Sequence, residues 1–497
     1  MLTRLNSFET IGLKSELVTV EVDVPPHLTG FTIVGLADTA VQESKVRIRS
    51  ALQNSGCEYP CGRRITINLA PADIKKVGPR YDLPMALGIL ISSGTLDLDP
   101  ASLCDTVFIG ELALDGSLRH VSALLPVVLA ARDKGMKRIV VPESNGAEAA
   151  LVPGLEVIAP KNLSECLKIL CRQIEIPKIS IPASANIQSN DSLIDFSDVR
   201  GQEQAKRALE IAAAGGHNVL MNGAPGAGKT LLANAFRGIL PPLTREESLE
   251  VTQIYSVADL LPRDVPLINE RPFRSVHHTA SSVSIVGGGR APKPGEISLA
   301  HHGVLFMDEL AEFPANVMEV LRQPLEDRRI TITRANGSVT FPASFILVAA
   351  MNPPSFSIRN RKNRISKPLM DRIDLNIDIQ PVDVEDLRSK RSKVSESSGE
   401  ILQRVIKARK RQTERFKNLR ISVNAQMNVK DLEKLCELDT ESEELIIRSV
   451  RQLGLSVRGC HKIVKLARTI ADLADCDDIC QRHVAEAIQY RHSHVPI

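Results

Sequence analysis

The sequence of 497 residues predicts an α/β fold whose carboxyl-terminal part is helical. Three observations lead to this prediction. Short β-branched runs alternate with helical stretches over about the first 170 residues. A second alternation of strand and helix patterns continues to Pro381. From Asp383 onward the strand signal disappears, and the pattern is helical and charged.

Composition and charge exclude several classes of protein. The chain is 43% hydrophobic and 24% charged with a net charge of +3, which is typical of a folded protein rather than a disordered or uniformly basic one. Its apolar tracts are shorter than the roughly 20 residues that span a bilayer, and the amino terminus lacks a signal peptide. The nine cysteines form no CxxC pair, which indicates reduced thiols rather than a disulfide frame or a zinc site. We therefore expect a cytoplasmic protein with no membrane partner.

The first predicted domain covers residues 1–175 and combines strands with helices. The expected strands are LVTVEVDV, FTIVGL, ITINLA, TVFIGELAL and RIVVP, and the expected helices are 38–54, 84–92 and 122–134. Residues 176–196 contain Pro, Ser and Asn without an amphipathic period, so they are interpreted as a linker. The second α/β domain is predicted at 197–382, and the helical domain at 383–497.

A glycine-rich loop follows the apolar run HNVLMN and leads into the helical stretch LLANAFRGIL. It matches the pattern GxxxxGK[ST], in which glycines let backbone N–H groups surround phosphate oxygens, the lysine adds positive charge and the hydroxyl can hold Mg²⁺. An ordinary glycine turn is the alternative. The residues expected to bind the phosphates are Gly223, Ala224, Pro225, Gly226, Ala227, Gly228, Lys229 and Thr230.

Two carboxylates follow a second apolar strand, GVLFM. Asp308 suits the ligand shell of Mg²⁺ together with Thr230, and Glu309 can polarise an attacking water. An acidic pair after a strand can also cap a helix. Because this pair follows a phosphate-binding loop, we expect it to be catalytic.

Three further polar residues are candidates. Asn352 ends the strand FILVAAMN and could contact both a γ-phosphate and the attacking water, or simply form a turn before proline. Arg372, flanked by acids, is either an arginine finger that reaches a neighbouring subunit or part of a surface salt bridge. Arg458 lies near a predicted helix start, where a phosphate partner or a nearby carboxylate would compensate its charge.

In order and spacing, these elements resemble the Walker A, Walker B, sensor 1, arginine finger and sensor 2 motifs of an AAA+ ATPase. The segment PFRSVHHTASSVSIVGGGRAPKPGEISLAHHGVLFMDEL is similar to the magnesium-chelatase-like branch, specifically the ComM/YifB family. The stretches TIVGLADTAVQESKVRIRSALQNSG, ITINLAPADIKK and RYDLPMALGIL are similar to the Lon-protease-like, ribosomal-S5-like α+β domain of the same family. The resemblance implies a AAA+ P-loop ATPase core with a carboxyl-terminal helical lid.

The resemblance also implies what the protein does. It implies a homo-hexameric ring that uses ATP and Mg²⁺, in which Arg372 completes the next subunit's site and Arg458 couples nucleotide state to lid movement. Gly201 and Gln202 lie where such proteins contact adenine. ComM-type members are associated with branch migration of DNA in natural transformation and homologous recombination. The expected partners are therefore branched or single-stranded DNA, and recombination proteins.

Two departures from the family pattern limit these expectations. Arg80 and Leu125 occupy the positions of the Lon-type serine and lysine, so we expect a binding or assembly module instead of a protease. The cysteine-rich segment that many members carry after the sensor asparagine is absent. A basic tract replaces it, which would bind phosphate or form a solvated loop: Arg359, Arg361, Lys362, Arg364 and Lys367.

Other basic residues predict DNA contacts. Arg290 and Lys293 fall in an insert that is similar to loops facing the pore of the ring. A predicted helix would present a broad cationic surface to a phosphate backbone through Arg404, Lys407, Arg409, Lys410, Arg411, Arg415, Lys417 and Arg420. Two other functions remain open: a chelatase-type motor that remodels a protein partner and inserts a metal, and a nucleotide-binding switch without turnover.

Overall fold

The computed structural model describes residues 2–26, 29–179, 194–262, 265–289, 292–334, 337–353, 365–380 and 396–491. The chain forms two compact units. One comprises Met1–Ile187 and Ser248–Asn269, and the other comprises Gln188–Glu247 and Glu270–Ile497. No sequence signal had singled out the segment Ser248–Asn269. The predicted linker lies largely outside the described residues, and the domain boundaries given above stay predictions.

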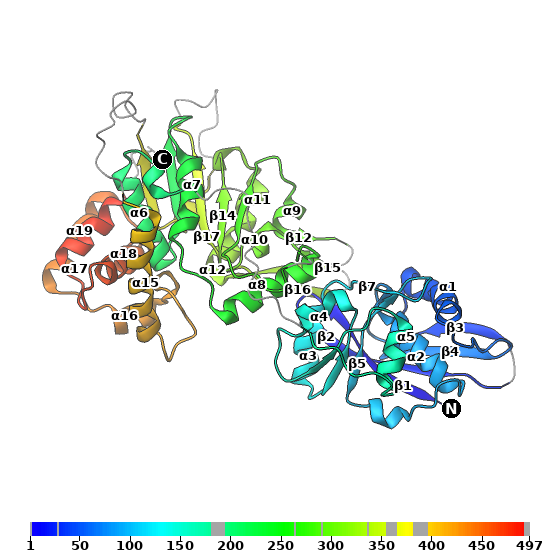
Figure 1. Ribbon diagram of the computed structural model, residues 1–497. Coiled ribbons are helices and arrows are strands. Elements are labelled where there is room, and N and C mark those ends of the chain that lie inside the picture. Colours follow the sequence, from blue (N-terminus) through cyan, green and yellow to red (C-terminus); the bar gives the residue numbers. More distant parts are fainter. Residues whose placement is uncertain are drawn as a thin grey trace. The chain divides into compact units, whose positions relative to one another are not determined.

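The first unit, mainly blue to cyan in Figure 1, contains a mixed seven-stranded sheet. Its strand order is β3-β4-β2-β1-β5-β8-β9. Neighbouring pairs are antiparallel for β1–β2 and β2–β4 and parallel for the others. The strands are β1 (Thr3–Ile11), β2 (Lys14–Asp23), β3 (Gly30–Val34), β4 (Arg64–Ala70), β5 (Thr106–Phe108), β8 (Arg138–Val140) and β9 (Glu156–Ile158). The helices are α1 (Thr39–Asn54), α2 (Asp82–Ser92), α3 (Leu124–Asp133), α4 (Glu143–Ala149), α5 (Leu163–Leu170) and most of α8 (Arg245–Ala258).

Strand β1 was missed by the sequence analysis. Its period of two is hidden because polar Thr3, Ser7 and Glu9 are buried beside Leu5 and Phe8. Glu9 is held by the Tyr81 hydroxyl at 2.6 Å and by the backbone N–H of Val77 at 2.9 Å. A buried carboxylate with such partners can replace an apolar residue in a strand.

Arg80 and Leu125, which the sequence resemblance places at the Lon-type serine and lysine positions, have structural contacts in this unit. Arg80 donates through Nη1 to the Thr10 hydroxyl at 3.0 Å and through Nη2 to the carbonyl of Ser122 at 3.3 Å. Leu125 is fully buried in α3. A guanidinium and an alkyl group supply neither a nucleophile nor a base.

The second unit is built on a five-stranded parallel sheet of order β11-β14-β17-β10-β18. Its strands are β10 (Val219–Gly223), β11 (Phe273–Val276), β14 (Val304–Met307), β17 (Ile346–Met351) and β18 (Leu375–Ile379). In a parallel sheet the carboxyl ends of all strands lie at one edge. The segments that follow β10, β11, β14 and β17 therefore converge there.

The carboxyl-terminal part is helical, as predicted (Figure 1). It contains α15 (Ser398–Arg415), α16 (Val429–Leu435), α17 (Thr440–Leu453), α18 (Val457–Leu473) and α19 (Gln481–Gln489). Ser397, Asn428, Asp439 and Ser456 cap the starts of four of them by accepting a backbone N–H.

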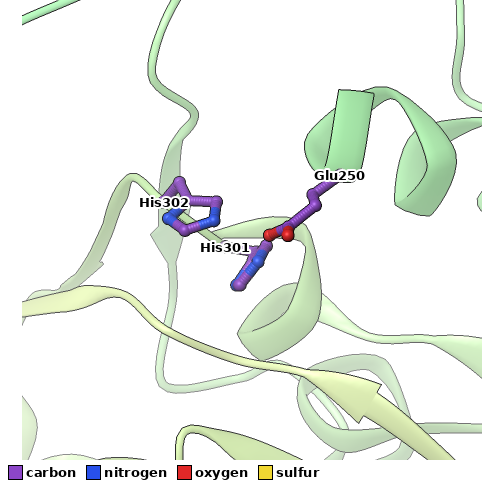
Figure 2. Close-up of side chains that lie close together, drawn as sticks. All are labelled: Glu250, His301 and His302. Atoms are coloured by element: carbon purple, nitrogen blue, oxygen red, sulfur yellow. The ribbon is translucent and has the colours of Figure 1, made fainter. Parts of the chain in front are cut away.

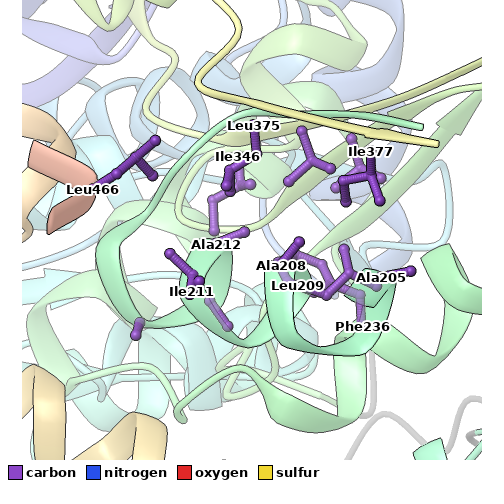
Figure 3. Packing of buried hydrophobic residues seen from close by; sticks show 14 of the residues in the cluster. Ala205, Ala208, Leu209, Ile211, Ala212, Phe236, Ile346, Leu375, Ile377 and Leu466 are labelled. Carbon is purple, nitrogen blue, oxygen red and sulfur yellow. The ribbon is translucent and has the colours of Figure 1, made fainter. Parts of the chain in front are cut away.

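One hydrophobic core joins these helices to the sheet of the second unit. Helix α6 (Glu203–Gly215) packs Ala205, Ala208, Leu209, Ile211 and Ala212 near β17, β18 and α18 (Figure 3). Because the helices and the sheet bury apolar side chains in the same cluster, they form one compact unit.

Smaller elements complete the described fold. In the second unit they include α7 (Lys229–Ala235), α9 (Ser282–Val286), α10 (Glu296–Leu299), α11 (Ala315–Val320), α12 (Arg322–Asp327), α13 (Lys367–Met370) and the hairpins β12 (Gly287–Gly288) with β13 (Lys293–Pro294) and β15 (Arg329–Arg334) with β16 (Gly337–Pro342). The first unit adds the pair β6 (Glu111–Leu112) and β7 (Leu118–Arg119). Over the described ranges, every helix is too short or too polar to cross a bilayer.

Candidate nucleotide-binding site

The glycine-rich loop connects β10 to α7 at the carboxyl edge of the parallel sheet. Gly226 and Gly228 adopt φ values of +80° and +91°, which favour glycine. A Cβ atom at either position would meet no protein atom within 4 Å, so it would project into the open space at the loop. The absence of side chains lets a phosphate approach the backbone N–H groups at the start of α7.

Lys229 lies at the centre of this loop. Its Nζ donates to the carbonyls of Gly223 at 2.6 Å and Ala224 at 3.0 Å, and to Oδ1 of Asn352 at 2.9 Å. Burial lowers the pKa of Lys229, and the carboxylates of Asp308 and Glu309 oppose that shift. The structure therefore brings together the lysine and the asparagine that the sequence analysis had proposed separately.

A second hydrogen bond at this edge joins Thr230, which follows β10, to Asp308, which follows β14. The Thr230 hydroxyl donates to Oδ2 of Asp308 at 3.2 Å, while Oδ1 of Asp308 accepts the backbone N–H of Glu309 at 2.9 Å. A hydroxyl and a carboxylate oxygen are hard ligands of the kind Mg²⁺ prefers. The donor set of loop amides, an ammonium and two such oxygens fits a nucleotide with its magnesium ion.

Glu309 has an unusual backbone conformation and an unexpected neighbour. Its φ of +52° places it in the left-handed region, which is uncommon for a residue other than glycine. Oε2 of Glu309 lies 3.3 Å from Nδ1 of His278. The sequence analysis missed His278, although it comes two residues after β11, whose end meets the same sheet edge.

The two predicted arginines, Arg372 and Arg458, both contact Glu326 in α12. Nη2 of Arg372 is 2.5 Å from Oε1 of Glu326, and Nη1 of Arg458 is 3.3 Å from the same oxygen. The hydrogen bond from Arg372, with the charges of both arginines, holds the pKa of Glu326 below its usual value. The side chain of Arg372 is only 9% exposed, whereas that of Arg458 is 60% exposed. Sequence reasoning had not identified Glu326.

Gly201 and Gln202 precede α6, and both have positive φ. Nε2 of Gln202 donates to the carbonyl of Gln380 at 2.5 Å, which links this turn to the residue after β18. Their proposed contact with adenine stays a prediction.

Acids of the same unit pair with four of the eight cations expected on and after α15, so the cationic surface is narrower than predicted, and its contact with DNA stays a prediction. Arg404 pairs with Glu210 and Glu396, and Lys407 pairs with Asp475. The ion pairs continue with Arg411 to Asp475 and Asp477, and with Arg415 to Asp472. The sequence hid this compensation, since the acids come from other elements. Lys410, Lys417 and Arg420 remain exposed.

The other predicted DNA contacts are only partly described. Lys293 is exposed on β13. Arg290 lies outside the described residues, as do Arg359, Arg361, Lys362 and Arg364, and the side chain of Lys367 is not described either.

Three family models match the chain. They are "Magnesium chelatase, subunit ChlI" over residues 195–387, "Subunit ChlI of Mg-chelatase" over residues 20–145, and "Magnesium chelatase, subunit ChlI C-terminal" over residues 395–491. The first covers the nucleotide-binding loop and both carboxylates, and the last covers the helical part.

Two similar proteins align over almost the full length of the chain, and a third aligns over part of it. The chain is 42% identical over 499 residues to "Competence protein ComM" of Haemophilus influenzae, with 97% of this chain and 96% of that protein covered. It is 41% identical over 497 residues to "Uncharacterized protein YifB" of Escherichia coli, covering 97% and 95%. A "Magnesium-chelatase 67 kDa subunit" of Chlorobaculum parvum is 29% identical over 211 residues, covering 41% of this chain and 29% of that protein.

Proposed function

Because the chain belongs to the ComM/YifB family of magnesium-chelatase-like AAA+ proteins, we propose that it is an ATP-hydrolysing ring motor that remodels DNA. The observation that supports hydrolysis is the convergence of Lys229, Thr230, Asp308 and Asn352 at one edge of the sheet. The DNA substrate is supported by the relative named a competence protein. We propose branch migration in recombination or natural transformation as the process.

The loop residues 223–230, among them Lys229, bind the phosphates of the nucleotide. Lys229 now donates to two loop carbonyls and to Asn352, and it exchanges the carbonyls for phosphate oxygens when nucleotide binds. Thr230 and Asp308 would supply the hydroxyl and carboxylate oxygens that hold Mg²⁺. Bound Mg·ATP supplies the phosphoanhydride bond that is cleaved.

Glu309 acts on the attacking water as a general base, since its side chain is 47% exposed and comes directly after Asp308. Asn352 positions that water and contacts the terminal phosphate through its amide. Nδ1 of His278 lies 3.3 Å from Oε2 of Glu309 without an aligned hydrogen bond, and we propose that the ring positions this carboxylate through that contact. His278 is thus a positioning residue, since it reaches the water only through Glu309.

The ring completes the site. We propose that Arg372 exchanges Glu326 for the terminal phosphate bound by a neighbouring subunit in a homo-hexamer. Arg458 contacts the same carboxylate from the first turn of α18, so the same exchange changes the position of that helix. Glu326 keeps both cations compensated in a single subunit.

The first unit is proposed to be a Lon-protease-like module for binding or assembly. Arg80 and Leu125 stand where such a protease needs its serine and lysine. DNA contact is assigned instead to the second unit, where exposed Lys293 on the β12–β13 hairpin faces the pore of the ring. A hydrogen-bonded hairpin presents this cation on a short, defined support.

A chelatase-type motor that acts on a protein partner is the second candidate. Its support is the match to a magnesium-chelatase subunit over 41% of this chain. The match to a competence protein covers 97%, so it favours DNA.

The test is the rate of ATP hydrolysis by the full-length protein without DNA and with single-stranded, duplex or four-way junction DNA. The proposal requires Mg²⁺-dependent hydrolysis that branched DNA stimulates. Hydrolysis that no DNA affects, together with capture of a protein subunit that stimulates it, would favour the chelatase-type motor instead.

A further inference from the structure

A small cavity lies at the opposite edge of the five-stranded sheet from the nucleotide loop. Arg271, His302 and Ser344 line it, and each stands two residues before the start of a parallel strand: β11, β14 and β17 respectively. Four to six residues of strand, about 13 to 20 Å, separate this edge from the carboxyl ends. The cavity is therefore distinct from the nucleotide site.

The charge of the lining is unbalanced. Three guanidinium groups, those of Arg271, Arg328 and Arg409, surround the cavity, and Glu247 is the single carboxylate among its described lining residues. Glu247 is already engaged, because its Oε2 lies 2.9 Å from Nη2 of Arg271. Over the described ranges, Arg328 and Arg409 form no ion pair with a carboxylate.

Among the described residues, Arg328 and Arg409 also have side-chain N–H groups without a hydrogen-bond acceptor. Arg409 uses Nε and Nη2 on the carbonyl of Ala213, at 3.1 and 2.7 Å. Arg328 makes one long contact, 3.5 Å from Nη1 to the hydroxyl of Ser344. A guanidinium offers five N–H groups, so most donors of Arg328 and two on Nη1 of Arg409 are available to a ligand.

Burial also destabilises the charged forms of Arg328 and Arg409. It lowers the pKa of Arg328 to about 10 and that of Arg409 to about 9, and repulsion from Arg271 adds to the shift at Arg409. Arginine in water keeps its proton far above these values. Burial of the guanidinium groups is the main cause of both shifts, and the carboxylates of Asp374 and Glu247 oppose the shifts at Arg328 and Arg409 respectively.

The size of the cavity limits the ligand. Its volume is about 40 Å³, which at roughly 10–15 Å³ per water position holds about three water molecules. A tetrahedral oxyanion matches this volume, whereas a nucleotide base or a peptide does not fit. Guanidinium groups bind phosphate with paired, charge-assisted hydrogen bonds.

We propose that this cavity binds a phosphate group, which Arg271, Arg328 and Arg409 hold together. His302 lines one side, and its ring lies against that of His301 with centroids 3.9 Å apart and planes tilted by 46° (Figure 2). Arg409 belongs to α15, whereas Arg271 and Arg328 belong to the segments around the sheet. A bound phosphate therefore bridges the helical part to the sheet. This inference does not rest on the proposed action on DNA.

Isothermal titration of the full-length protein with inorganic phosphate tests the site. A non-hydrolysable ATP analogue and Mg²⁺ fill the nucleotide loop beforehand, so that phosphate cannot bind there. The variants are Arg328→Gln and Arg409→Gln, and the control is Lys410→Gln, which removes an exposed cation from the helix that carries Arg409. Thermal melting establishes that each variant is folded.

The wild type and Lys410→Gln should bind one phosphate per chain, and each arginine variant should weaken binding about tenfold or more. Equal binding by all four proteins, or no saturable heat at millimolar phosphate, would overturn the proposal. If Arg409→Gln does not fold, Arg328→Gln decides, since the Arg328 side chain makes only one long hydrogen bond, at 3.5 Å, among the described residues. Failure of the ATP analogue to bind would count against the proposed function and leave this comparison intact.

A competition arm distinguishes two sources of the phosphate group. An oligonucleotide with a 5′-phosphate is added during the titration, and the same oligonucleotide without it serves as control. Displacement by the phosphorylated strand alone assigns the site to a nucleic-acid end, and displacement by neither assigns it to free phosphate. Equal displacement by both strands would overturn the proposal, since the terminal phosphate would then make no difference.

Discussion

Arg372 and Arg458 contact the same oxygen of Glu326, Arg372 through Nη2 at 2.5 Å and Arg458 through Nη1 at 3.3 Å. The contacts of Lys229, by contrast, run to its own loop and to Asn352. The two arginines are thus grouped with each other. If one of them acts on a neighbouring subunit, the shared contact places the other on the same side of that interface.

Mixing experiments follow from this grouping. We expect Arg372→Ala and Lys229→Ala, each inactive alone, to recover some hydrolysis when mixed, because some interfaces then combine an intact loop with an intact arginine. Arg458→Ala should be rescued by Lys229→Ala in the same way.

The mixture of Arg372→Ala with Arg458→Ala should stay inactive, since every interface would lack one arginine. Rescue in that mixture would show that Arg458 serves the loop of its own subunit, and would contradict the grouping.

Glu309→Gln should bind ATP normally and lower the hydrolysis rate by about 10² or more, because the amide cannot accept a proton from water. Lys229→Ala should instead weaken nucleotide binding. Binding is measured with a fluorescent ATP analogue and turnover by phosphate release. Glu312→Gln, in the short helix that follows, is the matched control. Equal turnover by the wild type and Glu309→Gln would remove Glu309 from the reaction.

His278→Leu should lower kcat while leaving KM for ATP nearly unchanged, because the leucine cannot hold the Glu309 carboxylate. His278→Asn should restore much of the rate, since an asparagine amide donates from a similar position. A residue with only a packing role would show the reverse order, with leucine tolerated better than asparagine.

Stability should fall as the pH decreases from 7 to 5, and His217 should contribute to that loss. Burial lowers the pKa of His217 in the folded state, opposed by Asp374 and assisted by Lys465 and Lys462. An unfolded histidine titrates at about pH 6.5, so the unfolded state takes up a proton first and gains stability as the pH falls.

The measurement is the thermal unfolding midpoint of the wild type and His217→Gln across this range, with His461→Gln as the control. The decrease between pH 7 and 5 should be smaller for His217→Gln. An identical decrease in all three proteins would exclude His217 as a contributor.

Lys293→Glu should reduce the ratio of DNA-stimulated to unstimulated hydrolysis several-fold, because the reversed charge repels a phosphate backbone. Lys430→Glu, which makes the same change at an exposed lysine on α16, serves as the control. Equal ratios for the two variants would remove Lys293 from the DNA contact. The stimulation should also decrease with salt, as counterion release requires.

Much of the second unit could be predicted from its sequence, because the glycine-rich loop, Asp308 and Asn352 each come at the end of an apolar strand. The strands before Gly223, Asp308 and Asn352 are all present, and their shared sheet edge explains why these residues meet. His278 gave no comparable signal, since two adjacent histidines after a short strand have no fixed meaning in sequence. Glu326 gave no signal either, since a single acid in a helical stretch has no fixed meaning in sequence.

The cationic surface of α15 is narrower than predicted for a different reason. Periodicity places its cations on adjacent turns, but it does not reveal the acids opposite them. Asp472 and Asp475, which pair with Arg415, Lys407 and Arg411, come from the end of α18 and the residues after it. Long-range ion pairs of this kind are visible only once the chain is folded.

The most direct test of the proposed motor is displacement of a strand from a four-way DNA junction, measured with ATP, with the non-hydrolysable analogue and with Glu309→Gln. If the protein is such a motor, the wild type should convert the junction to its products only with ATP and Mg²⁺, and Glu309→Gln should bind the junction without converting it. Conversion by Glu309→Gln at the wild-type rate, or a wild type that hydrolyses ATP but leaves every junction intact, would contradict the proposal.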